Sequence, residues 1–568
     1  MSSSTRYAPP AAAGDAPERD GPDTVDLDDV DVGVEFVDDG APAPPSALRP
    51  IRVARAMALG VLIAGIAVLA VQFHRTGHPQ GDDFALYLRQ ARAVFAGNTA
   101  EVVADNRFAV ANSDPLFSPD SYPWGFPLLL APLVRLWGLD YELLKLVEMA
   151  VLCLGFVLIH GVVRRRTNAV VAWFVVATLG LSSAYLAHTG NLLSEYPHLL
   201  AVVTTIWFLD RTLDSATWFD AARWRLVVLG LLAAVAFNVR REGVVLVGVF
   251  AVAQAFDLTD RWRARGRLGL PRLPLVWRSE WLTLVTPYAA FLAAAGAFQV
   301  LLPTTLMPDN DNRFGNVPTR ATEAVDVIAK QLGFGPHTGW GVVLVVAAAV
   351  GAVVGVVRAP RLHVPIVALA VGTGLVVGTH LRMIDRYYLQ ITPWVLMYAV
   401  YAAVIGAAAV VGVVATALRR SAGARGSTGR GPAVAGTAVA CAALFALVPS
   451  RVTQLVDEID RVQDADATGV PQVGPTDAAS RAIFAAVERE TSADDVVGYF
   501  RSRTLTLYTG RRAIQTTSLQ RMAEVADYYA MKRDSSYWQP SVDDDIEEYG
   551  MSIAWQDANW TLYRFGDD

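Results

Sequence analysis

The chain has 568 residues, of which 53% are hydrophobic and 18% charged, with a formal net charge of −6 and a mean hydropathy of +0.34. This content is too apolar for a soluble enzyme, and several runs of about 18 or more largely uncharged apolar residues are long enough to span a bilayer. Only two cysteines occur, Cys153 and Cys441, both inside apolar segments, so a disulfide framework is not expected. Because lipid offers no partner to free backbone groups, the spans must be helices, and the sequence predicts a polytopic α-helical membrane protein.

The N-terminal region, residues 1–55, is predicted to be a disordered acidic tail on the cytoplasmic side. It is rich in Pro, Ala, Ser and Asp and has few large apolar residues. Arg52 and Arg55 precede the first apolar run, residues 57–73. The tail is too long and too acidic for a signal peptide, so this run is expected to be an uncleaved first helix with its N-terminus inside.

Hydropathy predicts about eleven membrane-spanning helices within a module of residues 56–449. Two of them flank a charged stretch at residues 238–243 and are short for a full crossing, so those charges must face a cavity or the interface. A further apolar stretch, residues 126–137, is too short to span and is expected to be an interfacial helix. The expected spans are residues 57–73, 143–163, 170–187, 192–209, 226–239, 244–256, 282–302, 341–357, 364–379, 389–418 and 432–448.

Arginine placement supplies an independent test of this topology. Every predicted inner loop is basic, as the positive-inside rule requires. The agreement predicts a multi-pass plasma-membrane protein with a cytoplasmic N-terminus, and it makes topology rather than ligand binding the default account of these arginines. They are Arg164, Arg165, Arg166, Arg211, Arg223, Arg225, Arg261, Arg263, Arg265, Arg267, Arg272, Arg278, Arg358, Arg361, Arg419, Arg420, Arg425 and Arg430.

The composition changes to that of a soluble domain over residues 450–568. Helical periodicity alternates there with short β-branched and aromatic runs, which indicates a small α/β domain. An odd number of spans places this domain on the extracytoplasmic side. The expected helices are residues 477–490 and 518–531, and the expected strands are residues 496–500, 513–517, 552–555 and 560–565.

Two adjacent carboxylates, Asp82 and Asp83, lie in the first outer loop, residues 74–142. Because Asp is a favoured N-cap, Asp83 is expected to cap an amphipathic interfacial helix over residues 84–95, with Leu88, Ala91 and Phe95 on its apolar side. Both carboxylates could be caps or solvated charges only. An Asp at the membrane surface beneath a loop can instead remove a proton from a substrate hydroxyl, so one of the two is a candidate catalytic base.

Further charged side chains recur at the outer ends of later spans. Glu195 and His198 lie at the mouth of one span, where a charge is costly unless it faces a cavity. Glu195 could be a second acid or base, could orient an arginine, or could form a structural ion pair with Arg240 or Arg241. Four arginines that the topology rule does not explain could bind a phosphate bidentately or snorkel to lipid phosphates. They are Arg240, Arg241, Arg382 and Arg386.

Four motifs, in order, resemble those of the GT-C glycosyltransferases, specifically the protein-O-mannosyltransferase-like and aminoarabinose-transferase-like branch. The first matches by the spacing of Asp83 to Tyr87, and the resemblance covers residues 57–448. Residues 507–511 are also similar to C-terminal tails in this branch. The four motifs are residues 81–98, 122–133, 192–200 and 385–394.

The resemblance implies a GT-C fold, an active site at the outer face, and transfer of a sugar from a polyprenyl-phosphate donor to an acceptor hydroxyl with inversion. It implies Asp83 as the general base, with Asp82 beside it; Glu195 is the further catalytic carboxylate that its place at the mouth of a span suggests. The donor phosphate would be bound by cations drawn from Arg240, Arg241, Arg382 and Arg386. The expected donor or acceptor pocket contains Tyr87, Tyr122, Trp124, Tyr196, His198 and Tyr387.

The expected partners are the polyprenyl-phosphate sugar, a glycan, lipid or protein acceptor, and the membrane, with no nucleic acid. The bias to Arg, Ala and Val suggests a GC-rich genome, and a GC-rich Gram-positive source would favour decaprenyl-phosphate mannose or arabinose as the donor. No cofactor is required, although Asp82, Asp83 and Glu195 could together bind one divalent cation. The alternative function is a transporter or lipid flippase, because intramembrane charge marks such proteins equally well.

Overall fold

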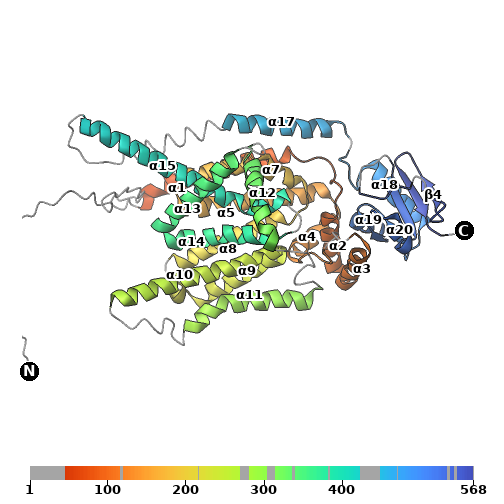
Figure 1. Cartoon of the computed structure of the whole chain (residues 1–568), viewed down its shortest axis with the longest axis horizontal. Coiled ribbons are helices and arrows are strands. Elements are labelled where there is room, and N and C mark those ends of the chain that lie inside the picture. The colour runs from red at the N-terminus through yellow and green to blue at the C-terminus, as the bar shows by residue number, and fades with distance from the viewer. Residues whose placement is uncertain are drawn as a thin grey trace, which may run out of the picture. The chain divides into compact units, whose positions relative to one another are not determined.

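The structure, a computed structural model, describes most of the chain from residue 45 onward (Figure 1). The described residues are 45–114, 119–214, 217–268, 280–303, 314–334, 339–380, 384–421, 448–469, 471–533, 538–542 and 546–566. The acidic tail predicted over residues 1–55 lies largely outside them, as does the span predicted over residues 432–448.

Helices make up most of the described chain, and a five-stranded sheet follows them. The α-helices are α1 (Pro45–Val71), α2 (Asp83–Ala96), α3 (Thr99–Asn112), α4 (Gly125–Trp137), α5 (Tyr141–Arg166), α6 (Ala169–Gly180), α7 (Ser183–Leu186), α8 (Glu195–Leu213), α9 (Arg223–Val239), α10 (Val245–Arg267), α11 (Trp281–Leu301), α12 (Val317–Gln331), α13 (Trp340–Arg358), α14 (Pro360–Gly378), α15 (Thr392–Ser421), α17 (Val448–Ala467), α18 (Ala478–Glu490), α19 (Ser502–Thr509) and α20 (Leu519–Val525). The 3₁₀ helices are η2 (Ala187–Gly190), η3 (Trp218–Asp220), η4 (Arg241–Val244), η6 (Phe314–Asn316) and η7 (Asp385–Gln390). The strands are β1 (Val496–Gly498), β2 (Arg512–Ile514), β3 (Tyr528–Lys532), β4 (Ser552–Gln556) and β5 (Trp560–Arg564).

Seven helices in the described part of the chain are long and apolar enough to cross a membrane, or eight if α6 and its continuation, bent by 65°, form one broken span. The expected number of about eleven is not confirmed. Helices α8 and α9 were both expected as spans, but neither is among the seven, since α9 has only 17 residues and α8 carries charge at both ends. The seven lie in α1, α5, η4–α10, α11, α13, α14 and α15.

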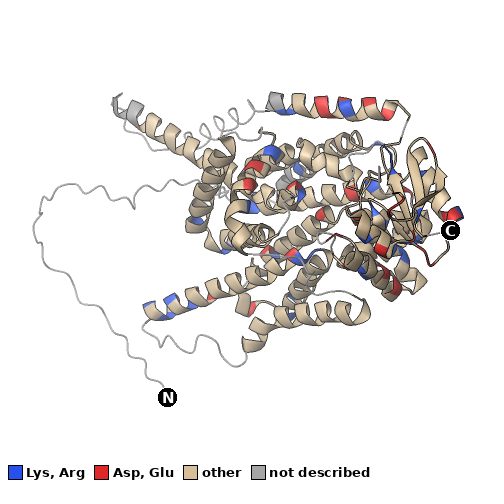
Figure 2. Cartoon of the chain, turned by 45° about the vertical axis from the view of Figure 1, so that its right-hand side comes forward, with Lys and Arg blue, Asp and Glu red and all other residues tan. Residues whose placement is uncertain are grey.

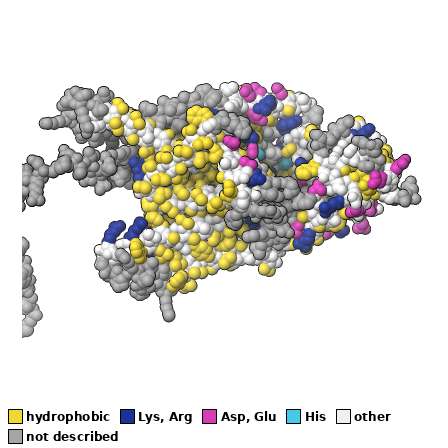
Figure 3. Space-filling view, in the orientation of Figure 1, with side chains coloured by type: hydrophobic (Ala, Val, Ile, Leu, Met, Phe, Trp, Pro, Cys, Tyr) yellow, Lys and Arg dark blue, Asp and Glu magenta, His cyan; other side chains and the backbone are white. Residues whose placement is uncertain are grey.

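The outward surfaces of these helices are apolar, as lipid contact requires. Val300 on α11 is 86% exposed and Val357 on α13 is 77% exposed. Hydrophobic side chains gather over the helical part of the face shown in Figure 3. The protein is therefore a multi-pass membrane protein.

The predicted inner helix ends meet at one end of the bundle. Arg166 at the end of α5 binds both carboxylate oxygens of Asp210 near the end of α8, each at 2.6 Å. Arg361 near the start of α14 lies 3.5 Å from Asp257 of α10. In Figure 2 the ribbon is blue at several Lys and Arg positions near the C-terminal end of α10. Because Glu195 begins the same helix, α8, that carries Asp210 in its last turns, Glu195 lies at the opposite end of the bundle.

The C-terminal sheet has the strand order β2-β1-β3-β5-β4, parallel across its first three strands and antiparallel beyond. The predicted helix over residues 477–490 is confirmed as α18, and three predicted strands are confirmed as β1, β4 and β5. The predicted strand over residues 513–517 is shorter and shifted, as β2. The helix predicted over residues 518–531 is wrong in its second half. It ends at Val525, and the aromatic segment after it forms β3, the central strand, whose first residues are buried.

The first outer loop contains three helices, α2, α3 and α4, and packs as part of the protein core. The expected apolar side of α2, with Leu88, Ala91 and Phe95, is confirmed at Leu88 and Ala91, which are buried, and not at Phe95. Phe95 is 58% exposed, whereas Leu86 and Leu88 on different sides of α2 are fully buried. The reason is that α4 and Leu507 of α19 pack in one cluster with Leu88, whereas Val102 of α3 packs against Leu86. Helix α4 is itself the short apolar helix expected over residues 126–137.

Candidate active site

Asp83 begins α2 and is held by two donors from distant segments. The Tyr122 hydroxyl donates to its Oδ1 at 2.5 Å, and Nη2 of Arg386 donates to its Oδ2 at 2.5 Å. Burial would raise the pKa of Asp83, but Arg386 and the Tyr122 hydroxyl outweigh it, so the pKa lies below its usual value. The predicted capping role is wrong, because Asp82 occupies the N-cap position and its side chain makes no capping bond.

Charges of alternating sign continue from Asp83 as one ladder. Nε of Arg386 lies 3.0 Å from Oε1 of Glu195, and Nη1 of Arg240 donates to the same oxygen at 2.9 Å. Nη2 of Arg240 donates to Oε1 of Glu242 at 2.9 Å, and Nε2 of His380 lies 3.8 Å from that oxygen. We call Asp83, Arg386, Glu195, Arg240 and Glu242 the charge ladder. Each guanidinium in it is shared between two carboxylates, which balances the charge where water is scarce.

The two arginines of the charge ladder lie at breaks between helices. Helix α9 ends at Val239, Arg240 is extended with φ −149° and ψ 139°, and η4 resumes at Arg241. The break expected between two helices at residues 238–243 is thus confirmed, but the second helix is longer than expected: with η4 it runs to Arg267 and is one of the seven candidate spans. Arg386 lies in η7, between α14 and α15. A break in a helix both frees polar backbone and turns charged side chains inward.

The start of α8, which carries Glu195, is fixed by three buried polar groups. The backbone N–H of Leu192 donates to Nε2 of His78 at 3.1 Å, and that of Leu193 donates to Oε1 of Glu148 at 3.3 Å. The hydroxyl groups of Tyr87 and Ser194 lie 3.1 Å apart. These bonds satisfy backbone donors that precede the helix and set the position of its first carboxylate.

Aromatic rings border the ladder. The guanidinium carbon of Arg240 lies 4.9 Å from the centre of the Tyr387 ring, and that of Arg386 lies 6.0 Å from it. The rings of Tyr87 and Tyr122 lie 4.5 Å apart. These contacts bring three of the predicted pocket residues to the site, and they orient the two arginines by cation–π attraction.

The second aspartate of the pair faces the C-terminal domain. Oδ1 of Asp82 accepts from the backbone N–H of Arg503 at 3.2 Å, and Oδ2 accepts from Nη1 of Arg501 at 3.3 Å. Burial raises the pKa of Asp82, and the two arginines only partly offset that effect. Sequence reasoning missed both arginines. The only signal was the family-like segment at residues 507–511, a few positions along the same helix.

Several predicted site residues lie away from the charge ladder. Trp124 donates from Nε1 to the carbonyl of Pro303 at 2.8 Å and is 1% exposed. Tyr196 donates to the carbonyl of Tyr185, inside the helical core. Their roles in the structure are to hold α4 and α8 in place.

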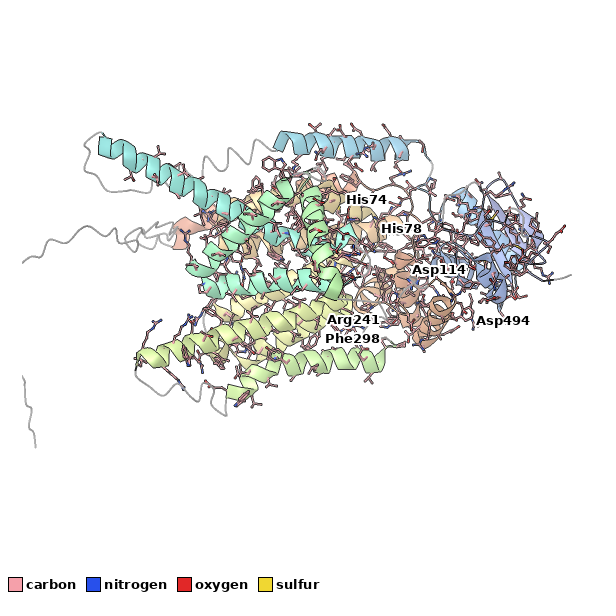
Figure 4. The ribbon with its side chains drawn as sticks, viewed as in Figure 1. His74, His78, Asp114, Arg241, Phe298 and Asp494 are labelled. Atoms are coloured by element: carbon pink, nitrogen blue, oxygen red, sulfur yellow. The ribbon has the colours of Figure 1, made fainter. Side chains whose placement is uncertain are left out.

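Three further predicted site residues, Arg241, His198 and Arg382, are not members of the charge ladder. The guanidinium of Arg241 lies 4.5 Å from the Phe237 ring, next to its own helix break and outside the ladder (Figure 4). His198 is buried one turn below Glu195, and neither of its ring nitrogens has a hydrogen-bond partner among the described residues. Arg382 lies outside the described residues.

The three carboxylates considered for a divalent cation do not converge on one point. Asp82 is bound to arginines of the C-terminal domain, whereas Asp83 and Glu195 are bound to Arg386. Among the described residues, no group of three or more His, Cys, Asp or Glu side chains could hold a metal ion. The donor set therefore does not fit a cation, and no step is derived through one.

Comparison with known proteins finds similarity to solved structures only. No protein-family model and no curated protein matches the chain. The chain is similar in structure to ArnT from Cupriavidus metallidurans bound to undecaprenyl phosphate, with a TM-score of 0.51, 14% identity, and 89% of this chain and 98% of that chain covered. The apo state of the same protein gives a TM-score of 0.50 with the same identity and coverage. The oligosaccharyltransferase AglB from Archaeoglobus fulgidus gives 0.49 at 12% identity, covering 84% of this chain and 69% of that chain. The chain thus shares its fold with ArnT, in agreement with the fold that its motifs implied.

Proposed function

We propose that this chain, which has a GT-C fold, is an integral-membrane glycosyltransferase that moves a sugar from a polyprenyl-phosphate donor to an acceptor hydroxyl at the outer face of the membrane. The observation that carries the proposal is the charge ladder. It joins the carboxylate of Asp83 to Arg386 and, through Glu195, to Arg240, at the end of the bundle opposite the basic helix ends. ArnT, whose fold this chain shares, has been solved with undecaprenyl phosphate bound.

Arg386 and Arg240 are suited to bind the donor phosphate. Both contact the same oxygen of Glu195, so their guanidinium groups converge on one side of that carboxylate. A guanidinium presents a planar fork of donors that matches a phosphate. In the absence of donor, the carboxylates hold these arginines in place. A bound phosphate competes for them, which weakens the contact between Arg386 and Asp83 and leaves Asp83 free to accept a proton.

The reaction follows as a single displacement. The acceptor oxygen attacks the anomeric carbon, its proton passes to a carboxylate oxygen of Asp83, and the bond from that carbon to the phosphate oxygen breaks. The leaving polyprenyl phosphate gains negative charge, which Arg386 and Arg240 stabilise. One displacement inverts the anomeric configuration. Glu195 keeps the two arginines oriented and does not itself transfer a proton.

The lipid part of the donor needs access from the bilayer, which the apolar outer surfaces of the spans provide. We take the donor to be a polyprenyl-phosphate hexose or pentose, with mannose and arabinose as the first to test, and the acceptor to be an envelope glycan, lipid or protein. Residues 56–449 form the catalytic module, the tail 1–55 is cytoplasmic, and the domain 450–568 is extracytoplasmic in the plasma membrane.

The decisive experiment measures transfer from labelled polyprenyl-phosphate sugars in membranes that contain the wild-type chain or Asp83→Asn. The substitution keeps the shape of the side chain but removes the base, so transfer should fall by about 10²–10⁴-fold while donor binding persists. Asp120→Asn is the matched control, because Asp120 lies in the same loop and its carboxylate pairs with the exposed Arg107. Transfer at the wild-type rate by Asp83→Asn would show that Asp83 is not the general base.

The same assay separates the proposal from a lipid flippase. A transferase consumes the labelled donor and releases unglycosylated polyprenyl phosphate, whereas a flippase leaves the sugar on the lipid and changes only its leaflet. Recovery of intact donor with every acceptor fraction tested would favour the flippase.

A further inference from the structure

We propose that Arg503 of the C-terminal domain is a positioning residue for this reaction, which orients the Tyr122 hydroxyl and, through it, the carboxylate of Asp83. The inference rests on the proposed function of the charge ladder. Arg503 is 381 positions from Tyr122 in sequence and lies on α19, the helix of the C-terminal domain that packs against α2.

Arg503 reaches out of its own domain into the first outer loop. It is 2% exposed. Its Nε donates to Oδ1 of Asn106 at 2.8 Å, Nη2 donates to the carbonyl of Pro119 at 2.6 Å, and Nη1 lies 3.4 Å from the Tyr122 hydroxyl. Three nitrogens of one planar group therefore fix α3 and the segment that leads into Tyr122. Its guanidinium carbon also lies 5.5 Å from the centre of the Tyr122 ring.

The chemistry of the donors sets the direction of the Tyr122 hydrogen bond. A guanidinium can only donate, so the Tyr122 oxygen must accept from Arg503. Its single hydrogen is then available to Asp83, whose Oδ1 lies 2.5 Å away. Arg503 thus directs the Tyr122 proton onto one oxygen of Asp83, while Arg386 occupies the other. Once a donor phosphate draws Arg386 away, Oδ2 is the oxygen left to receive the acceptor proton.

Asp82 links α19, the helix that carries Arg503, to the first outer loop. Its carboxylate accepts from the backbone N–H of Arg503 and from the side chain of Arg501, and the hydroxyl of Thr504 donates to the carbonyl of Gly81. The two adjacent aspartates therefore have different roles. Asp82 joins the first outer loop to α19, and Asp83 faces the substrate. This role differs from the catalytic one expected for Asp82 from the sequence.

Two substitutions at Arg503 separate geometry from charge. Arg503→Lys keeps the positive charge but cannot reach three partners with one planar group. We expect its kcat to fall by about 10–100-fold, because small misplacements of a catalytic group carry losses of that size, with the donor KM changed by less than about threefold. Its pH profile should keep the wild-type acid limb.

Arg503→Gln removes the charge as well. Its kcat should fall at least as far, and the acid limb of its pH profile should move to higher pH. The loss of a nearby cation raises the pKa of Asp83, whose ionised form is the base, so activity disappears at a higher pH as the medium is acidified. Arg512→Gln is the matched control. Arg512 joins the same domain to α3 through Asp105 at 3.4 Å but touches neither Asp82 nor Tyr122, so its kcat and acid limb should match the wild type.

Hydrogen–deuterium exchange of the full chain in detergent gives a readout that needs no activity. Arg503→Gln should speed exchange in residues 119–124 and at the start of α2, while the C-terminal sheet stays as protected as in Arg512→Gln. Unchanged exchange at residues 119–124, or a wild-type kcat and acid limb in Arg503→Gln, would overturn the inference. A wild-type chain that transfers no sugar, together with the predicted exchange, would instead overturn the proposed function and leave the positioning contact standing.

Discussion

Neighbouring residues of the same type acquire opposite properties from their surroundings. Burial raises the pKa of Asp82, whereas Arg386 and Tyr122 lower that of Asp83. Asp83 and the arginines of the charge ladder could be predicted as site residues from the sequence, because charge at the ends of apolar helices costs free energy unless it faces a cavity or a partner. It could not reveal Arg503, because a single arginine in a soluble domain carries no such cost until the fold buries it.

The surroundings of His78 predict how the stability of the protein depends on pH. Burial lowers its pKa to about 3, and its Nε2 can accept from Leu192 only while unprotonated, with Nδ1 directed to the carbonyl of Pro79. Because the folded pKa lies below the unfolded value near 6.5, the stabilisation is complete above pH 6.5 and is lost as the pH falls toward 3. At pH 5 the loss is about 2 kcal/mol.

The measurement is the apparent Tm of the detergent-solubilised chain between pH 7.5 and 5. It should fall with acid more steeply in the wild type than in His78→Gln, which cannot titrate. Parallel curves for the two proteins would show that His78 does not carry the effect.

Single elements were predicted well where one physical signal dominated. The break between α9 and η4 follows from charge between two short apolar runs, and α4 follows from an apolar run too short to cross. Prediction failed where tertiary contact decided the outcome. Helical periodicity continued past Val525, yet the segment Tyr528–Lys532 gains more as the central strand, between β1 and β5. In the same way, α2 is buried on more than its predicted apolar side, because α3 packs against Leu86.

The contact between α4 and α9 depends on a missing side chain. A Cβ at Gly125, the first residue of α4, would lie 2.6 Å from the carbonyl oxygen of Asn238, which belongs to the last turn of α9. Gly125→Ala should therefore separate the two helix ends and destabilise the protein by about 1–3 kcal/mol. It should also lower transfer, because Arg240 directly follows that turn.

Thermal unfolding and the transfer assay test this prediction together. Gly248→Ala is the control, since a Cβ at Gly248 on α10 meets no atom within 4 Å and alanine favours a helix. A Tm for Gly125→Ala equal to that of Gly248→Ala would contradict the close approach.

The whole molecule has two chemically distinct ends. Arginines that pair with carboxylates near the ends of α5, α8 and α10 mark one end, and the charge ladder marks the other. Arginine counting in the sequence could predict this polarity, because it depends on loop composition alone. The number of spans could not be predicted equally well, since hydropathy alone did not exclude α9, which has only 17 residues, or α8, which carries charge at both ends.

Cysteine labelling tests the orientation that we propose. In a chain with Cys153 and Cys441 replaced by alanine, Asp494→Cys in the C-terminal domain should react with a membrane-impermeant thiol reagent added to intact cells (Figure 4). Ala264→Cys near the end of α10 should react only after the membrane is opened. Both positions are exposed. The reverse pattern would place the charge ladder on the cytoplasmic side and contradict the proposed outer-face reaction.

The most direct test of the central claim is an experimental structure of Asp83→Asn with a polyprenyl-phosphate sugar bound. The account predicts phosphate oxygens within about 3 Å of guanidinium nitrogens of both Arg386 and Arg240, with Arg386 moved away from residue 83. It also predicts the anomeric carbon on the side that residue 83 faces. A phosphate held elsewhere, with Arg386 still against residue 83 and Glu195, would contradict the claim that the charge ladder is the donor site.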